Sequence, residues 1–316
     1  MRFTYLIILF LLFNCNEKNT TPVIAIHGGA GVILKGALSK ERENLIREKL
    51  DEAISRGYEI LNASGSSTDA VIETIKILEN SPLFNAGKGA VFTNQGTIEH
   101  DASIMNGADL NAGSSSGTMY VKNPITLAHA IMTKSDHVFL SGTGAEEFAK
   151  MKNLDMVDQD YFYTEFRFNQ LKKMESDAKF GTVGCVAMDT NGNLAAGTST
   201  GGMTNKKWGR IGDSPIIGAG TYANNKTCAV SCTGSGEYFI RSVVAYDVSA
   251  LIEYESLSLK DAVSKVIHKK LPSIGGDGGL IAIDNKGNIV MDFNTPGMYR
   301  ASINKNGEKV IQIYSE

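Results

Sequence analysis

The spacing of apolar residues near the start of the chain predicts a strand followed by two helices. Residues 23–27 are a short apolar run that ends on a glycine-rich stretch, as expected for a buried strand. Residues 43–61 then carry apolar side chains at helical spacing. A second helical pattern follows, which Ser67 or Thr68 can cap and which stops before Pro82.

The middle of the chain changes character several times. Residues 85–120 are rich in glycine and predict short strands, and Asn123-Pro124 opens a helix that runs through Met132. A short strand is expected at 138–140 and a helix at 144–151. Residues 172–181 lack either period and predict a solvent-exposed linker.

After this linker come two similar hairpins separated by two helices. Each hairpin has an apolar strand, a turn that contains glycine, and a returning strand: 182–188 with 193–200, and 280–283 with 288–293. The helices are expected at 238–254 and 258–268, and the second begins with a capping box of Ser258 and Asp261. This order predicts an α+β protein in which helices pack against antiparallel sheets.

Composition limits the possible functions. The 316 residues are 42% hydrophobic, which is enough for one large domain or two small ones. The 31 basic and 34 acidic residues give a net charge of -3, and no Lys/Arg run predicts nucleic-acid binding. The 33 glycines gather in clusters, which indicates tight turns and close backbone approaches.

The N-terminus predicts export. Residues 5–13 are apolar but too short to cross a bilayer, and they suit a signal peptide. Residues 12–15 resemble a bacterial lipoprotein box with Cys15 as the lipidated residue, although Asn14 departs from it. An ordinary secretory signal is the alternative. Either way, 1–15 would be a targeting segment and 16–22 a tether, and the protein would be periplasmic or attached to an envelope membrane, the latter only through Cys15.

The other cysteines do not predict a disulfide or a metal site. In a strand, Cys228 and Cys232 would share one face about 13 Å apart, which is too far for a disulfide. Their spacing matches no zinc motif. We expect these two and Cys185 to be buried thiols.

Pattern alone does not identify the chemistry. The five histidines offer no close Ser/His/Asp arrangement and no metal cluster. His27, at the end of a strand, is more often a hydrogen-bonded structural residue than a base. The glycine-rich segment 28–31 is an incomplete dinucleotide fingerprint.

Six short segments together are specific. They begin with His-Gly-Gly-Ala-Gly and include Phe-Gly-Thr-Val-Gly, and they occupy residues 27–31, 82–89, 180–184, 197–206, 209–215 and 231–237. In this order and spacing the chain resembles the plant-type L-asparaginase/isoaspartyl peptidase family from about residue 23 to its end. Members of that family are threonine N-terminal nucleophile hydrolases.

The resemblance implies a four-layer αββα sandwich and a chain that cuts itself. One hydrolase domain, residues 23–316, would be cleaved between Gly181 and Thr182 into 23–181 and 182–316. A threonine hydroxyl is a poor nucleophile without an adjacent base. The freed α-amino group has a reference pKa of about 7.7–8.0, so it can serve as that base, and catalysis would need no cofactor.

The resemblance also assigns residues around the nucleophile. Thr200 would orient and polarise Thr182. Thr233, with the backbone N–H of Gly234, would form the oxyanion hole. Asn85 would contact the region around the nucleophile.

A second group would bind the substrate. Arg210 would pair with the α-carboxylate, and Asp213, helped by the carbonyl of Gly236, would bind the α-ammonium group. Lys207-Trp208 departs from the family pattern at the rim of this pocket. Without the resemblance, Arg210 and Asp213 could be a loop ion pair, and the threonines ordinary strand residues.

The resemblance implies one further site, a sodium ion held by a loop. Its ligands would be the backbone carbonyls of Leu78, Glu79, Ser81, Phe84, Ala86 and Lys88.

The implied activity is hydrolysis of β-aspartyl (isoaspartyl) dipeptides and L-asparagine to release L-aspartate, by a dimer of αβ pairs. Two alternatives remain at this point. One is a glycosylasparaginase with a similar nucleophile, and the other is an inactive envelope binding protein that keeps the sandwich.

Overall fold

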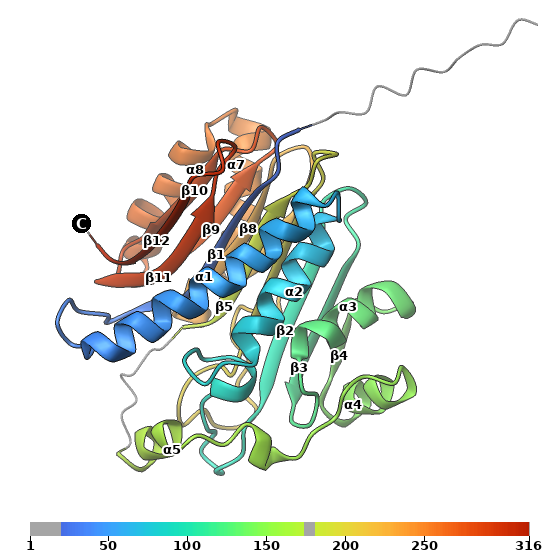
Figure 1. The fold of residues 1–316 in the computed structure, drawn as a ribbon, viewed down its shortest axis with the longest axis vertical. Coiled ribbons are helices and arrows are strands. Elements are labelled where there is room, and N and C mark those ends of the chain that lie inside the picture. The colour runs from blue at the N-terminus through green and yellow to red at the C-terminus, as the bar shows by residue number, and fades with distance from the viewer. Residues whose placement is uncertain (1–19, 174–180, 316) are drawn as a thin grey trace, which may run out of the picture.

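The computed structural model describes residues 20–173 and 181–315. Two β-sheets face each other, and helices cover the outer side of each (Figure 1). This arrangement confirms the predicted four-layer αββα sandwich. In the part of the chain that is described, the helices are too short or too polar to span a bilayer.

The larger sheet has eight strands within the described residues. Their spatial order is β12 (Lys309–Tyr314), β11 (Gly297–Ile303), β1 (Val23–Gly31), β5 (Val183–Met188), β6 (Leu194–Thr200), β2 (His100–Asn106), β3 (Ala112–Thr118) and β4 (Phe139–Ser141). Adjacent strands are antiparallel, except that β3 and β4 are parallel. β1, which precedes residue 181, therefore lies between β11 and β5, which both follow residue 181, and β2 lies beside β6.

The smaller sheet faces the strands at the centre of the larger one. Its order, over the residues described, is β10 (Ile289–Phe293), β9 (Gly278–Asp284), β8 (Cys228–Gly234) and β7 (Thr221–Ala223). Both predicted hairpins are confirmed, and each belongs to a different sheet: β5 with β6, and β9 with β10.

The helices form the two outer layers. The larger sheet carries α1 (Lys40–Asn62), α2 (Ser67–Glu79), α3 (Pro124–Lys134) and α4 (Gly142–Met151), and the smaller sheet carries α6 (Gly236–Ser242), α7 (Val244–Glu255) and α8 (Leu259–Lys265). The remaining helical segments are η1 (Gly87–Gly89), η2 (Gln159–Tyr161), α5 (Glu165–Lys172), η3 (Val266–Lys270) and α9 (Leu271–Ser273). Helices were expected near α1, α2, α3, α4, α7 and α8, and all are present.

Two details of the helices differ from the prediction. The cap of α2 is Ser66, whose Oγ accepts a hydrogen bond from the backbone N–H of Asp69 at 3.0 Å. The single helix expected at 238–254 is wrong, because Val243 has left-handed dihedral angles (φ 51°, ψ 49°) and separates α6 from α7. Ser258 is the N-cap of α8, as expected, since its Oγ accepts from Asp261 N at 3.2 Å, while Asp261 Oδ2 accepts from Ser258 Oγ at 2.6 Å.

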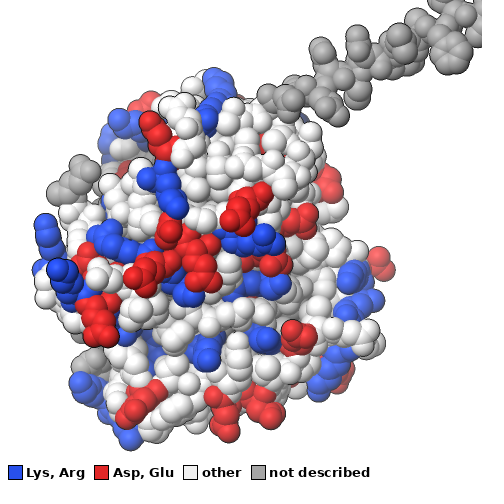
Figure 2. Space-filling model, in the orientation of Figure 1, with Lys and Arg blue, Asp and Glu red and all other residues white. Residues whose placement is uncertain are grey.

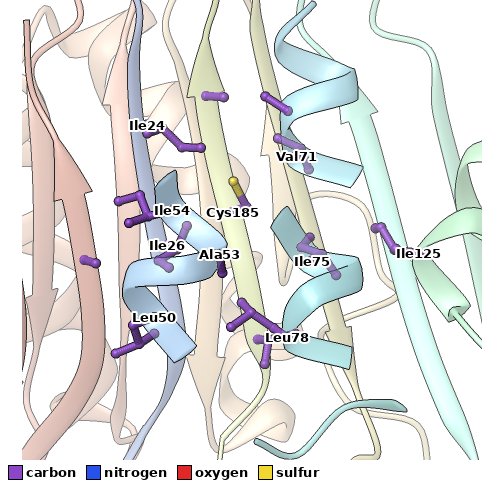
Figure 3. Close-up of a cluster of buried hydrophobic side chains, with 14 of the residues drawn as sticks. Ile24, Ile26, Leu50, Ala53, Ile54, Val71, Ile75, Leu78, Ile125 and Cys185 are labelled. Atoms are coloured by element: carbon purple, nitrogen blue, oxygen red, sulfur yellow. The ribbon is translucent and has the colours of Figure 1, made fainter. Parts of the chain in front are cut away.

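The two faces of the central strands belong to different cores. On β1, Ile24 and Ile26 pack under α1 and α2, and Val23 and Ala25 between them face the smaller sheet. Figure 3 shows Ile24 and Ile26 beneath α1, where Ile54 is fully buried. Burying such an aliphatic side chain contributes about 1.5–3 kcal/mol, so both faces of β1 stabilise its position.

The described cysteines are free and buried, as expected. Cys185 lies in the core under α2 (Figure 3), and Cys228 and Cys232 lie between the smaller sheet and its helices. Burial raises the pKa of Cys228 to about 12. These thiols therefore have no reactive thiolate at neutral pH.

Acidic and basic side chains are interspersed on the face that carries α1 (Figure 2). Along this helix, Arg47 pairs with Glu43 at 2.8 Å and Arg56 with Glu59 at 3.4 Å. No large area of one sign covers the described part of this face, in agreement with the balanced composition.

Candidate active site

Thr182 directly precedes β5, where its side chain is buried at 7% exposure. Its Oγ1 donates a hydrogen bond to Thr200 Oγ1 at 3.2 Å and lies 3.3 Å from Ser214 Oγ. Three hydroxyl groups, two from the β5–β6 hairpin and one from the segment that follows it, therefore meet at this point.

The ladder between β5 and β6 explains why Thr182 and Thr200 meet. Val183 pairs with Ser199, so the residues that follow outward along the two strands are Thr182 and Thr200. Thr200 Oγ1 also accepts from the backbone N–H of Gly202 at 3.0 Å. This bond fixes the rotamer of Thr200 toward Thr182.

Gly181 occupies a position that has no room for a side chain. A Cβ there would overlap Gly29 and would lie 2.7 Å from both Ala30 N and Thr233 Oγ1. Thr233 Oγ1 accepts from the N–H of Ala30 at 3.2 Å, so its own proton remains available for donation. Thr233 thus lies beside Gly181, the residue that precedes Thr182.

Arg210 and Asp213 also approach each other. A Cβ on Gly236 would lie 3.0 Å from Arg210 Nη2 and 3.0 Å from Asp213 Oδ1, so all three residues share one corner. The Arg210 guanidinium makes a bidentate pair with Glu237, at 2.9 Å for each bond. Burial raises the pKa of Asp213 to about 7, although the positive charge of Arg210 opposes this shift.

These residues surround one cavity of about 410 Å³. Its lining consists of Ala30, Gly181, Thr182, Thr200, Gly202, Met203, Arg210, Gly212, Asp213, Ser214, Gly234, Ser235, Glu237, Tyr238 and Arg241. The nucleophile and the charged pair predicted from the sequence therefore open into the same space. Thr233 and Gly236 lie against the lining residues.

Asn85 supports the segment after Thr200. Its Nδ2 donates to the carbonyl of Gly202 at 2.7 Å, and its Oδ1 accepts from Val91 N at 3.0 Å. The backbone N–H of Gly201 donates to the carbonyl of Asn85 at 3.2 Å. Asn85 thus connects the 78–88 loop to the edge of the cavity.

The 78–88 loop is tightly curled. Gly87 has φ 50°, and a Cβ there would overlap the carbonyl oxygen of Glu79. A Cβ on Gly89 would likewise overlap the carbonyl oxygen of Phe84. The loop thus folds back on itself, with Gly87 against the carbonyl of Glu79 and Gly89 against the carbonyl of Phe84. Among the described residues, no cluster of three His, Cys, Asp or Glu side chains offers another metal site.

Comparison with known proteins identifies the family. The asparaginase family model matches residues 20–313. An isoaspartyl peptidase of Salmonella typhimurium is 49% identical over 294 residues, 88% of this chain and 94% of that protein. The isoaspartyl peptidase of Escherichia coli is 48% identical, over 88% of this chain and 92% of that protein. A Mus musculus isoaspartyl peptidase/L-asparaginase is 40% identical, over 90% of this chain and 89% of that protein.

The chain belongs to the asparaginase family.

The family membership corrects one prediction from the sequence. The related isoaspartyl peptidases, including that of E. coli, are soluble cytoplasmic enzymes, so the expected periplasmic or envelope-anchored location is wrong. The physical argument for export came from the apolar run at 5–13 and from Cys15, which lie outside the described residues.

Three residues of this asparaginase-family site were not predicted. Ser214 and Glu237 lie inside the quoted segments, but only their contacts with Thr182 and Arg210 reveal what they do. Asp101 is fully buried on β2, directly opposite Thr200 in the ladder. Its raised pKa is caused by burial, and the charge of Lys206 opposes the shift. The available signal was an acidic residue near the start of the strand His-Asp-Ala-Ser-Ile-Met-Asn.

Proposed function

We propose that this asparaginase-family chain is an autoprocessing threonine amidohydrolase that cleaves β-aspartyl (isoaspartyl) dipeptides and L-asparagine, releasing L-aspartate. The names of the relatives support this substrate class. The observation that carries the mechanism is the position of Thr182. Its hydroxyl is held by Thr200 and Ser214, directly after a glycine that has no space for a side chain.

The first step is scission of the chain itself. Thr182 Oγ attacks the carbonyl carbon of Gly181, and the peptide C–N bond breaks as an ester to Oγ forms. The former amide nitrogen takes up the hydroxyl proton and becomes the free α-amine of Thr182. Water then hydrolyses the ester, which leaves a carboxylate on Gly181 and restores the hydroxyl.

The second step uses the new terminus on a substrate. The neutral α-amine accepts the proton of Thr182 Oγ as that oxygen attacks the side-chain carbonyl of the substrate. The amine or ammonia leaves with a proton, and water hydrolyses the β-aspartyl ester to L-aspartate. Thr233 Oγ and the N–H of Gly234 donate to the oxygen on which negative charge develops.

Arg210 and Asp213 select the substrate. Both substrates share a free α-carboxylate and a free α-ammonium group, which match the guanidinium and carboxylate at this corner of the cavity. Arg210 would exchange part of its pair with Glu237 for the substrate carboxylate. Blocking the α-amino group should therefore abolish binding.

The comparisons give no support to a glycosylasparaginase or to an inactive binding protein. We further propose a structural sodium ion on the carbonyls of Leu78, Glu79, Ser81, Phe84, Ala86 and Lys88, which the curl of this loop favours. The ion would fix the loop from which Asn85 reaches Gly202. We also propose that two αβ pairs form a dimer, by analogy with the family.

N-terminal sequencing and an activity assay test the proposal together. The purified protein should give two chains, one of which begins at Thr182, and should hydrolyse β-aspartyl-leucine and L-asparagine. Thr182→Ala should remain a single chain without activity. A glycosylated asparagine is the control substrate and should not be turned over. Hydrolysis by protein whose 181–182 bond is intact would refute the proposal.

A further inference from the structure

The ring of His27 connects the nucleophile to the space between the two sheets. It is fully buried, and its Nδ1 lies 2.9 Å from the carbonyl oxygen of Thr182. A carbonyl oxygen can only accept, so Nδ1 must carry the ring proton. The other ring nitrogen, Nε2, is then an acceptor, and Ser231 Oγ lies 2.9 Å from it. Ser231 Oγ is also 3.2 Å from the carbonyl of Gly197, which is a longer contact.

Three more hydroxyl groups continue the hydrogen bonds behind Ser231. Thr198 Oγ1 lies 2.7 Å from Ser231 Oγ, and Thr221 Oγ1 donates to Thr198 Oγ1 at 2.5 Å. Ser103 Oγ lies 2.8 Å from Thr221 Oγ1 and donates to the carbonyl of Ser214 at 2.6 Å. Since each hydroxyl has one proton, the bonds from Thr221 through Thr198 and Ser231 can all point toward His27.

This chain of hydrogen bonds joins both sheets. Its members lie on β2, β7, β6, β8 and β1, and each has a fully buried side chain: Ser103, Thr221, Thr198, Ser231 and His27. Buried polar groups of this kind are stabilising only when every member is satisfied. These hydrogen bonds therefore hold the imidazole of His27 in one orientation and one tautomer.

The absence of a side chain at Gly184 leaves space for the His27 ring. His27 pairs with Gly184 across the β1–β5 ladder, and a Cβ on Gly184 would overlap both the His27 ring and Ser231 Oγ. Burial also lowers the pKa of His27 to about 3, so the ring stays neutral at working pH. A neutral ring keeps one donor for Thr182 and one acceptor for Ser231.

Resting on the function proposed above, we propose that His27 is a positioning residue that holds Thr182 in place once scission has made it a chain terminus. A free terminus tends to fray unless it is tied down. After the cut, the link to Gly181 is gone, and the bond from Nδ1 to the Thr182 carbonyl fixes the backbone that carries both the hydroxyl and the amine. The hydroxyl chain behind the ring fixes the tautomer that makes this bond.

Two matched substitutions separate positioning from simple filling of the core. In His27→Asn, the amide nitrogen can occupy the place of Nδ1 and donate to Thr182, whereas in His27→Gln the amide reaches the place of Nε2 and contacts Ser231. His27→Ala removes both contacts. We expect kcat for β-aspartyl-leucine to fall about 10- to 100-fold in the Ala variant, since small misplacement of reacting groups has effects of this size. KM should change by less than about 3-fold, because Arg210 and Asp213 are untouched.

The comparison of Asn with Gln decides the matter. We expect Asn to recover most of the kcat lost in Ala, and Gln to recover little. Equal kcat values for the two, a better rescue by Gln, or an effect that appears in KM alone would overturn the positioning role. If the Ala variant does not fold, the comparison of the Asn and Gln variants remains the test. Circular dichroism and the extent of cleavage should be measured for each variant. Active wild-type protein with equal Asn and Gln variants refutes this inference alone, whereas an uncleaved or inactive wild type refutes the proposed function as well.

Discussion

The carboxyl group of Asp213 should change its charge near neutral pH. It is almost fully buried, at 3% exposure, and yet the proposed function requires it to be ionised in order to hold the ammonium group of the substrate. Its pKa of about 7 lies close to the reference range of the Thr182 α-amine. Two groups with similar pKa values must therefore both lose a proton before the site is competent.

The pH profile should report both groups. As the pH falls below about 7, Asp213 becomes neutral and the α-amine becomes charged, so log(kcat/KM) should decline with a limiting slope of about 2. In Asp213→Asn only the amine remains, and the slope should fall to about 1. At pH 8 this variant should lose about 10- to 100-fold in kcat/KM, the value of one hydrogen bond to a charged group. A slope that is the same in both proteins would show that Asp213 does not titrate in this range.

Glu237 is the second residue whose charge should matter. In the proposed function it would compete with the substrate carboxylate for the Arg210 guanidinium, with which it pairs at 2.9 Å, and its side chain is 55% exposed. Because exposed ion pairs contribute at most about 1 kcal/mol, Glu237→Gln should lower KM for L-asparagine by about 2- to 5-fold and leave kcat unchanged. Steady-state kinetics at low salt would detect this change. An increase in KM would mean that Glu237 orients Arg210 for the substrate instead.

The family resemblance assigned roles to Thr182, Thr200, Arg210 and Asp213, all of which line one cavity, but it did not indicate all of their partners. The reason is physical, since the partners are chosen by the tertiary arrangement. His27 and Ser231 are 204 residues apart and meet only because β1 and β8 face each other across the sandwich. A histidine without a nearby Ser or Asp in sequence therefore looked purely structural.

Among the elements, the junction of α6 and α7 shows where periodicity is not sufficient. Apolar residues continue at helical spacing through Val243, so the pattern predicts one helix. The observed φ of 51° at Val243 is one that a β-branched residue rarely adopts. The backbone N–H groups of Ala245 and Tyr246 bond to the carbonyls of Ala219 and Gly218 instead. These tertiary bonds compensate for the break, and no local sequence signal records them.

Removing the unfavourable left-handed backbone conformation of Val243 should stabilise the protein. In a Thr182→Ala background, which keeps one chain and simplifies unfolding, Val243→Gly should raise the free energy of unfolding by about 0.5–1 kcal/mol, because the left-handed cost of a residue with Cβ is about 1–2 kcal/mol. Val243→Ala keeps a Cβ and is the control, which should be less stable than the Gly variant. Urea unfolding would measure both. If Gly is the less stable of the two, the left-handed angles are not maintained in solution.

For the whole molecule, Glu79 connects the outer helical layer to the larger sheet through one buried carboxyl group. Its oxygens accept from Ser199 Oγ at 2.7 Å, Ile125 N at 3.0 Å and Asn123 Nδ2 at 3.0 Å, so it connects α2, α3 and β6. Burial raises its pKa from 4.5 to about 7. The folded state therefore holds this proton more tightly than the unfolded chain does. The resulting stability is fully present below about pH 4.5 and is lost as the pH rises through 7.

The substitution Glu79→Gln should remove this pH dependence. Between pH 4.5 and 8, the free energy of unfolding of the parent should fall relative to that of the variant by up to about 3 kcal/mol, the equivalent of this shift. Urea unfolding of both proteins in the uncleaved background at three pH values would show it. The other titrating groups are the same in both proteins, so their contributions to the pH dependence cancel in the difference between the two free energies of unfolding. A difference that does not change with pH would mean that Glu79 is ionised at all of them.

The fold class itself was predictable, because the apolar strands, turns and helices follow one another in an order that few architectures accommodate. The pairing of strands from the two ends of the chain was not, since sequence patterns carry no register between distant segments. β1 lies between β5 and β11, and β2 lies beside β6.

That interleaving has a consequence for the two products of scission. In the larger sheet, each piece supplies strands that pair with strands of the other, so neither piece alone can form that sheet, whereas the smaller sheet comes wholly from residues 182–316. After the proposed scission, the two polypeptides should therefore stay bound to each other through the larger sheet, and they should co-migrate through any native separation at one-to-one stoichiometry. Only a denaturant that melts the sheet would part them, and making the two pieces separately should yield insoluble material unless they are refolded together.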